Sequence, residues 1–213
     1  MSPPAPARAP AANLLEGRHV RLEPLAPEHA ADLFSAAGPE RYAYLPEHPP
    51  ADTKAVERWI EGALGRADPL FWAVVDTATG RCEGRQALMS IVPEHGVIEL
   101  GNIMWGGRMA RSRLATEAFF LHACHVFDDL GYRRFEWKCN ALNEPSRAAA
   151  RRFGFTYEGT FRQHRIAKGE NRDTAWFSII DSEWPAYRAA FERWLAPGNF
   201  DADGTQRTRL ALR

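Results

Sequence analysis

The chain has 213 residues, of which 45% are hydrophobic. This is enough for one domain whose core needs no disulfide bonds. It carries 27 lysines and arginines against 27 aspartates and glutamates, so its formal net charge is zero, and a general attraction to nucleic acid or to a membrane surface is not expected. Its three cysteines are an odd number without the spacing of metal ligands, which favours a reducing, cytoplasmic setting and no bound metal.

The two ends of the chain differ in composition from the rest. Residues 1–14 are rich in proline and alanine, and they predict a disordered leader. Residues 197–213 predict a loose C-terminal tail, which leaves residues 15–196 as a single folded domain. No apolar stretch reaches the length of a membrane-spanning helix, and the leader lacks the apolar centre of a signal peptide.

Apolar periodicity predicts the elements in chain order. Strands are expected at residues 20–24, 71–75, 84–92, 97–105, 132–139, 156–166 and 172–180. Helices are expected at residues 27–36, 52–64, 114–130, 145–152 and 183–195. This order indicates an α+β domain around a mixed sheet. The long helix at 114–130 connects strands 97–105 and 132–139 as a crossover, so these strands are predicted to be parallel neighbours.

The loop before the long helix has the features of an anion site. A strand that ends in a tight loop and opens a helix directs several backbone N–H groups, and the positive end of the helix dipole, at one point. Arg108, Arg111 and Arg113 add positive charge to this loop. The pattern favours a polyphosphate ligand; a solvated loop of charged side chains is the alternative.

Short segments along the chain resemble the GNAT acyltransferase superfamily and, within it, the ribosomal-protein N-terminal acetyltransferases of the RimJ/RimL type. Leu114-Ala-Thr-Glu-Ala118 and Asn143-Glu-Pro-Ser146 are two of them. The others lie at 16–25, 71–74, 98–101, 130–134, 153–155, 158–162 and 182–185. Their order and spacing carry the resemblance, which covers roughly residues 15–195.

The resemblance implies both a fold and an activity. The implied fold is a twisted, mostly antiparallel mixed sheet with a central crossover helix and helices on both faces. The implied activity is the transfer of an acetyl group from acetyl-CoA, used as co-substrate, to a primary amine by direct attack in a ternary complex. The acceptor would be a protein N-terminus or a small-molecule amine, and the enzyme a cytoplasmic monomer or homodimer without metal.

The resemblance also implies where acetyl-CoA binds. Its pantetheine arm would lie along the end of strand 97–105, and its diphosphate on the following loop. The family's phosphate pattern, Gln/Arg-x-x-Gly-x-Gly/Ala, falls on residues 110–115, with Arg113 at the middle glycine. Asn143 matches an asparagine that contacts the arm, although it could instead cap the short helix. The expected cofactor-binding residues are Ile103, Met104, Trp105, Ala110, Arg111, Ser112, Arg113, Leu114, Ala115, Thr116, Asn143 and Ser146.

The base and the acid that are common in the family are both replaced here by other residues. Lys138 stands where many members carry a base, and Ala150 where many carry a tyrosine acid. Glu136 or Glu99 is therefore the expected base, acting directly or through water; a surface ion pair is the alternative for Glu136 with Lys138. His164 and Asp173 are expected to bind substrate, because the last two strands wall the acceptor site in this fold.

Two other functions compete with acetyl transfer. The altered phosphate loop and the missing acid and base motivate a non-catalytic acyl-CoA-binding or sensor protein of the same fold. The arginine loop, extended by Arg147, Arg151 and Arg152, could bind nucleic acid. The neutral net charge argues against nucleic-acid binding. Neither nucleic acid nor a membrane is an expected partner.

Overall fold

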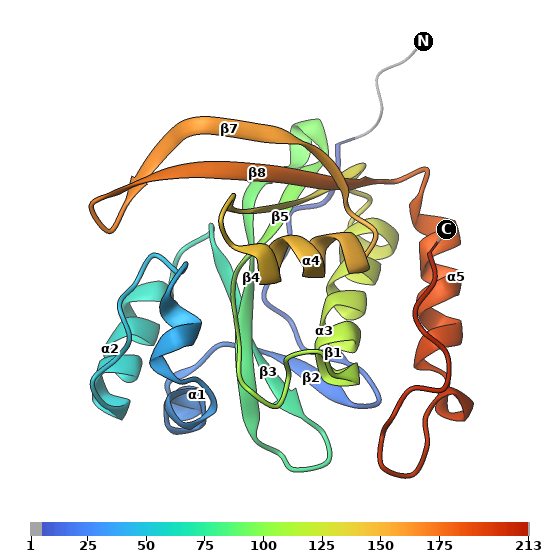
Figure 1. Cartoon of the computed structure of the whole chain (residues 1–213), viewed down its shortest axis with the longest axis horizontal. Helices are drawn as coiled ribbons and strands as arrows, with labels where there is room; N and C mark the ends of the chain where they lie inside the picture. Colours follow the sequence, from blue (N-terminus) through green and yellow to red (C-terminus); the bar gives the residue numbers. More distant parts are fainter. Residues whose placement is uncertain (1–5, 213) are drawn as a thin grey trace.

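The computed structural model describes residues 6–212, and its central feature is one eight-stranded sheet (Figure 1). The strands lie in the order β1-β2-β3-β4-β5-β6-β8-β7. β5 and β6 are parallel, as predicted, and the other neighbours are antiparallel. The strands are β1 (Leu15–Glu16), β2 (Val20–Pro24), β3 (Leu70–Asp76), β4 (Cys82–Val92), β5 (Val97–Trp105), β6 (Arg134–Asn140), β7 (Thr156–Ala167) and β8 (Glu170–Ile180).

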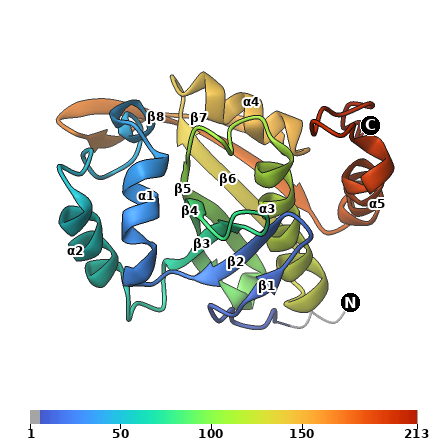
Figure 2. The same ribbon diagram turned by 90° about the horizontal axis from the view of Figure 1, so that it is seen from below.

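Helices cover both faces of this sheet (Figure 2). They are α1 (Ala30–Ala36), α2 (Thr53–Ala63), α3 (Arg113–Cys124), α4 (Glu144–Arg152) and α5 (Trp184–Leu195). Trp72 belongs to a core that includes Phe119 of α3, whereas the next residue, Ala73, belongs to a second core with Leu33 of α1 and Ile60 of α2. Neighbouring strand residues point to opposite faces, so α1 and α2 lie on one face and α3 on the other. The predicted α+β class is confirmed.

The crossover helix α3 departs from the prediction at its end. A single helix over residues 114–130 was expected from periodicity, but α3 ends at Cys124 and a π-helical turn, His125–Asp129, follows. The helix begins at Arg113, one residue before the predicted start, because the Ser112 hydroxyl caps it by accepting a hydrogen bond from the Leu114 amide at 3.1 Å. α3 therefore presents its N-terminus to the loop that follows β5.

The two ends of the described chain pack on the domain. Residues 6–14 differ from the expected disordered leader: the Ala7 amide donates to the Pro93 carbonyl at 3.0 Å, and the Trp72 indole donates to the Asn13 carbonyl at 2.8 Å. Small side chains let this segment lie close to the sheet without any apolar periodicity. The expected leader residues 1–5 lie outside the described residues. The C-terminal tail folds back beside α5 (Figure 1), and Leu212 packs on the core.

Candidate active site

The two parallel strands at the centre of the sheet separate after three residue pairs. Val97, Ile98 and Glu99 pair with Arg134, Phe135 and Glu136. Within residues 6–212, the later residues of β5 pair only with β4, and those of β6 only with β8. Their facing backbone edges thus have donors and acceptors available for an extended ligand.

A bulge lies on β5 just beyond the separation point. Asn102 has φ 48°, and the pairing register with β4 shifts between Arg85 and Ala87. A bulge turns the side chains that follow it and increases the local twist. It therefore contributes to the divergence of β5 from β6.

The loop after β5 is fixed to the domain through its glycines. The Gly106 amide donates to the Glu83 carbonyl at 2.8 Å, and the Gly107 amide to the Ala36 carbonyl at 3.1 Å. The loop then leads into the N-terminus of α3, a 12-residue helix. The first amides of such a helix have no carbonyl partner within the helix, which suits an anion.

The left-handed backbone position in this loop is Arg111. Its φ is 61°, a conformation that favours glycine, whereas Arg113 is in α3 with helical backbone. Arg111 thus differs in backbone conformation from Arg113, which stands at the middle-glycine position of the pattern expected at 110–115. The Arg111 side chain is exposed.

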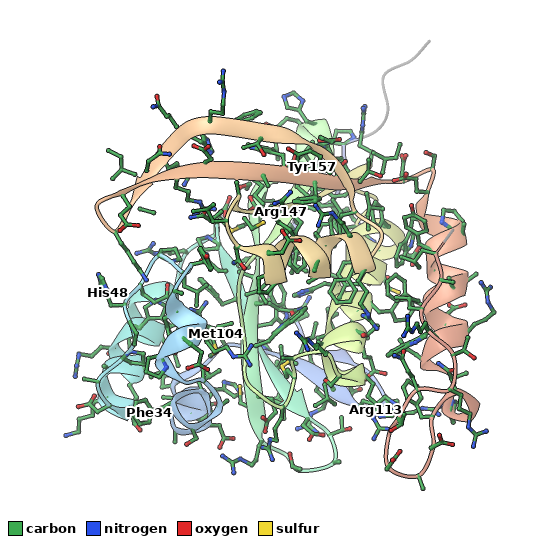
Figure 3. All side chains as sticks on the ribbon, viewed as in Figure 1. Phe34, His48, Met104, Arg113, Arg147 and Tyr157 are labelled. Atoms are coloured by element: carbon green, nitrogen blue, oxygen red, sulfur yellow. The ribbon has the colours of Figure 1, made fainter. Side chains whose placement is uncertain are left out.

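The other two loop arginines contact neighbouring segments. Arg108 forms an ion pair with Glu83, in which its Nε donates at 2.9 Å. The Arg113 guanidinium lies 5.7 Å from the Phe200 ring of the C-terminal tail (Figure 3). Arg111 is therefore the loop arginine best placed to meet an incoming anion.

A chain of charged side chains lies where β5 and β6 separate. Lys138 Nζ is 3.0 Å from Glu99 Oε2 and 2.8 Å from Glu136 Oε2. Arg134 donates from Nε to the other Glu136 oxygen at 2.7 Å, and it pairs with Glu158 on β7. Glu99 and Glu136 are each only 6% exposed, so these contacts are more than a solvated surface pair.

The two candidate bases differ in how their oxygens are used. Glu136 has one oxygen bound by Arg134 and the other by Lys138. In Glu99, the hydrogen bonds from Ser90 and Lys138 both go to Oε2. Glu99 Oε1 instead lies beside Gly101, 3.2 Å from the position of an added Cβ. Burial raises the pKa of Glu99, and the charge of Lys138 opposes that rise.

Residues 19–156 match the family of the acetyltransferase (GNAT) domain. The chain belongs to the GNAT acetyltransferase family. A GCN5-related N-acetyltransferase from Brucella melitensis is 52% identical, with a TM-score of 0.93 over 96% of this chain and 95% of that one. A probable GNAT-family acetyltransferase from Chromobacterium violaceum is 37% identical, with a TM-score of 0.80 over 87% and 94%.

More distant GNAT structures share the fold. RimL, an acetyltransferase of ribosomal L7/L12 solved in complex with coenzyme A, is 18% identical, with a TM-score of 0.66 over 80% of this chain and 99% of that one. These neighbours show the fold alone. A search of the curated proteins finds no match.

Several expected cofactor residues make internal contacts that restrict what they can offer. The amide oxygen of Asn143 accepts from the Ser146 amide at 3.1 Å, so it caps α4, while its amide nitrogen makes no hydrogen bond within residues 6–212. The Ser146 hydroxyl accepts from the Trp137 indole at 2.9 Å. Ala115 and Thr116 are buried. These last two would meet a ligand through their backbone alone.

The residues expected to bind substrate lie in different surroundings. His164 is 2.9 Å from the Thr174 hydroxyl and near the ring of Trp176, which itself lies 4.2 Å from Lys138 Nζ. Asp173 accepts from the Gln163 amide at 2.7 Å and is next to Thr174, on the opposite face of β8. The structure thus brings His164, but not Asp173, to the face that carries Lys138.

The sequence analysis missed one group of residues near this site. Arg85, Glu47 and Tyr42 line a cavity of about 250 Å³ beside α2. They come from three segments far apart in the chain, and no spacing pattern connects them.

Within residues 6–212, no three His, Cys, Asp or Glu side chains gather as a metal site, and none of the helices found there could cross a membrane.

Proposed function

We propose that this protein transfers an acetyl group from acetyl-CoA to a primary amine by direct attack in a ternary complex. The observation that carries the proposal is the position of the Glu99 carboxylate at the point where β5 and β6 separate, beside open strand edges. The N-terminus of α3 follows the far end of β5. Membership of an acetyltransferase family supports the same reaction.

The residues present fit acetyl-CoA, which supplies an activated thioester. The open edge of β5 offers backbone groups to an extended arm that contains amides. The first turn of α3 and Arg111 offer donors to a diphosphate. The Asn143 amide nitrogen can donate to the arm, because the oxygen of the same side chain is used in capping.

In the proposed reaction the amine nitrogen forms a bond to the acetyl carbonyl carbon, and the carbon–sulfur bond breaks. The proton lost by the amine passes to Glu99 Oε1, directly or through one water. A backbone N–H of the open β5 edge donates to the carbonyl oxygen. Lys138, held between Glu99 and Glu136, disfavours a second positive charge and so favours the neutral, reactive form of the amine.

A thiol-release assay tests this proposal. The protein is incubated with acetyl-CoA and a panel of peptides and small amines, and free CoA is measured together with the mass of the acetylated amine. We expect release that depends on the amine. Calorimetric binding of CoA without turnover of any amine would instead favour a non-catalytic acyl-CoA sensor.

The diphosphate site yields a mutational prediction. Arg111→Glu is expected to raise the Kd for CoA about tenfold, because it replaces a charge-assisted donor with a negative charge. Arg111→Gly is expected to retain affinity within a few-fold, because glycine suits φ 61° and the backbone amides remain. Calorimetry measures both, with exposed Arg66→Glu as the control. Equal weakening by both Arg111 variants would show that the side chain, not the backbone, holds the phosphates.

Lys138 gives a second prediction, on pH dependence. Glu99 must be deprotonated to accept a proton, so activity falls as the pH drops through its pKa. Lys138→Met removes the charge that lowers this raised pKa, so the acid limb of kcat/KM is expected to move to higher pH. Lys54→Met, on the exposed face of α2, is the control. An unmoved acid limb in the Lys138 variant would separate Glu99 from the proton transfer.

A further inference from the structure

The cavity of about 250 Å³ lies on the α1–α2 face of the sheet. Its walls are mostly apolar and include Val56 and Trp59 of α2, Met104 of β5, and the prolines of the loop that precedes α2. Figure 3 labels Met104 and His48, which line it from β5 and from that loop. The volume matches a single large side chain more closely than an extended ligand.

The carboxylate and the guanidinium in this cavity are paired with each other. Arg85 is only 2% exposed, and it forms an ion pair with Glu47. Its guanidinium lies 3.9 Å from the Trp59 ring. A cation brought into this space would find the only carboxylate of the lining, that of Glu47, already used by Arg85, and its desolvation would be costly. The walls therefore disfavour a cationic occupant and favour an apolar one.

Hydrogen bonds link the walls of this cavity to the segments of the candidate active site. Arg85 Nη1 donates to the carbonyl of Asn102, the bulge residue, at 2.8 Å. Glu99 Oε1 lies beside Gly101. Gly101 precedes Met104, a residue of the cavity wall, by three positions, a span of roughly 10 Å along a strand. Tyr44 lies in the segment between α1 and α2, which also supplies Glu47 and His48 to the cavity wall. Its hydroxyl donates to the Leu142 carbonyl at 3.2 Å, so this segment contacts the one that leads to α4.

We infer that this cavity receives the large, uncharged apolar side chain of the acceptor, whose α-amino group is then presented to Glu99. Preferred acceptors are thus α-amines of residues with aromatic or branched aliphatic side chains. Polyamines and aminoglycosides are poor acceptors, because they need unpaired carboxylates that this cavity does not offer. The inference rests on the proposed acetyl transfer and names the acceptor for it.

The experiment combines binding and turnover for matched amines. Calorimetry with CoA present measures the Kd of phenylalaninamide, glycinamide and lysinamide, and the thiol-release assay measures kcat/KM for the same three and for tetrapeptides that begin with phenylalanine or glycine. We expect phenylalaninamide to exceed both other amides by about tenfold or more in binding and in kcat/KM. The tetrapeptides show whether the enzyme also accepts a peptide N-terminus.

Two variants of α2 test the position of the occupant. Ala55 lines the cavity, so Ala55→Trp fills it and should remove the preference for phenylalaninamide. Arg58 is exposed on the same helix, and Arg58→Trp should retain it. Circular dichroism checks that both variants fold.

The outcomes separate this inference from the proposed function. Turnover of glycinamide or lysinamide as fast as phenylalaninamide would overturn the inference while acetyl transfer stands. Tight binding of phenylalaninamide, lost in Ala55→Trp but without acetylation of any amine, would overturn the proposed function and retain the cavity as a binding site. A preference that a folded Ala55→Trp variant keeps would show that another surface reads the side chain.

Discussion

Glu99→Gln is expected to lower kcat for acetyl transfer by on the order of 10²-fold or more, because a positioned base contributes roughly 10² to 10⁴. Glutamine keeps the size of the side chain and can still accept hydrogen bonds from Ser90 and Lys138, which now bind Glu99 Oε2. It cannot take the proton of the amine. The Kd for CoA should stay within a few-fold, so the loss appears in kcat.

Two control variants make this result specific. Glu136→Gln should lower kcat less, because both Glu136 oxygens are used by Arg134 and Lys138 and its role is to position Lys138. Glu94→Gln, at an exposed turn residue, should leave kcat unchanged. A larger loss in Glu136→Gln than in Glu99→Gln would exchange the roles of the two carboxylates. Equal kcat in Glu99→Gln and the unaltered protein would exclude Glu99 as the base.

Much of the fold could be predicted because its signals are local. Strand β5 has the predicted bounds, 97–105, since a turn with Pro93 precedes it and two glycines follow it. The parallel pairing of β5 with β6 followed from the intervening crossover helix, and the structure confirms it. The β8–β7 order at the sheet edge was not predicted, because strand order depends on long-range pairing.

The candidate site was predictable only in part, for the same reason. Glu99 and Glu136 could be assigned to neighbouring strands, but their different hydrogen bonds depend on a register that no local pattern defines. Glu47 and Arg85 are 38 residues apart in the chain, and their ion pair exists only because the fold brings the segment between α1 and α2 to β4. Arg111 was placed in the phosphate loop from the sequence, but its left-handed backbone became evident from φ.

One acidic residue of the resembling segment 114–118 has a structural use that the sequence did not indicate. Glu117 of α3 is 5% exposed, and it accepts three backbone hydrogen bonds from the start of β2. The donors are the amides of Arg18, His19 and Val20, at 3.1, 2.5 and 2.8 Å. An added Cβ on Gly17 would lie 2.8 Å from this carboxylate, so the chain passes very close to it. Glu117 thus joins the crossover helix to β2.

Glu117→Ala is therefore expected to lower the free energy of unfolding by about 3 kcal/mol, because it leaves buried amide donors without an acceptor. Glu117→Gln should cost less, since its oxygen still accepts while its amide nitrogen meets a donor. Glu61→Ala, exposed on α2, should stay within about 0.5 kcal/mol. Urea unfolding at constant m-value measures the three differences. If Glu117→Ala costs no more than Glu61→Ala, then water replaces the carboxylate without loss, and the start of β2 does not depend on α3 for its hydrogen bonds.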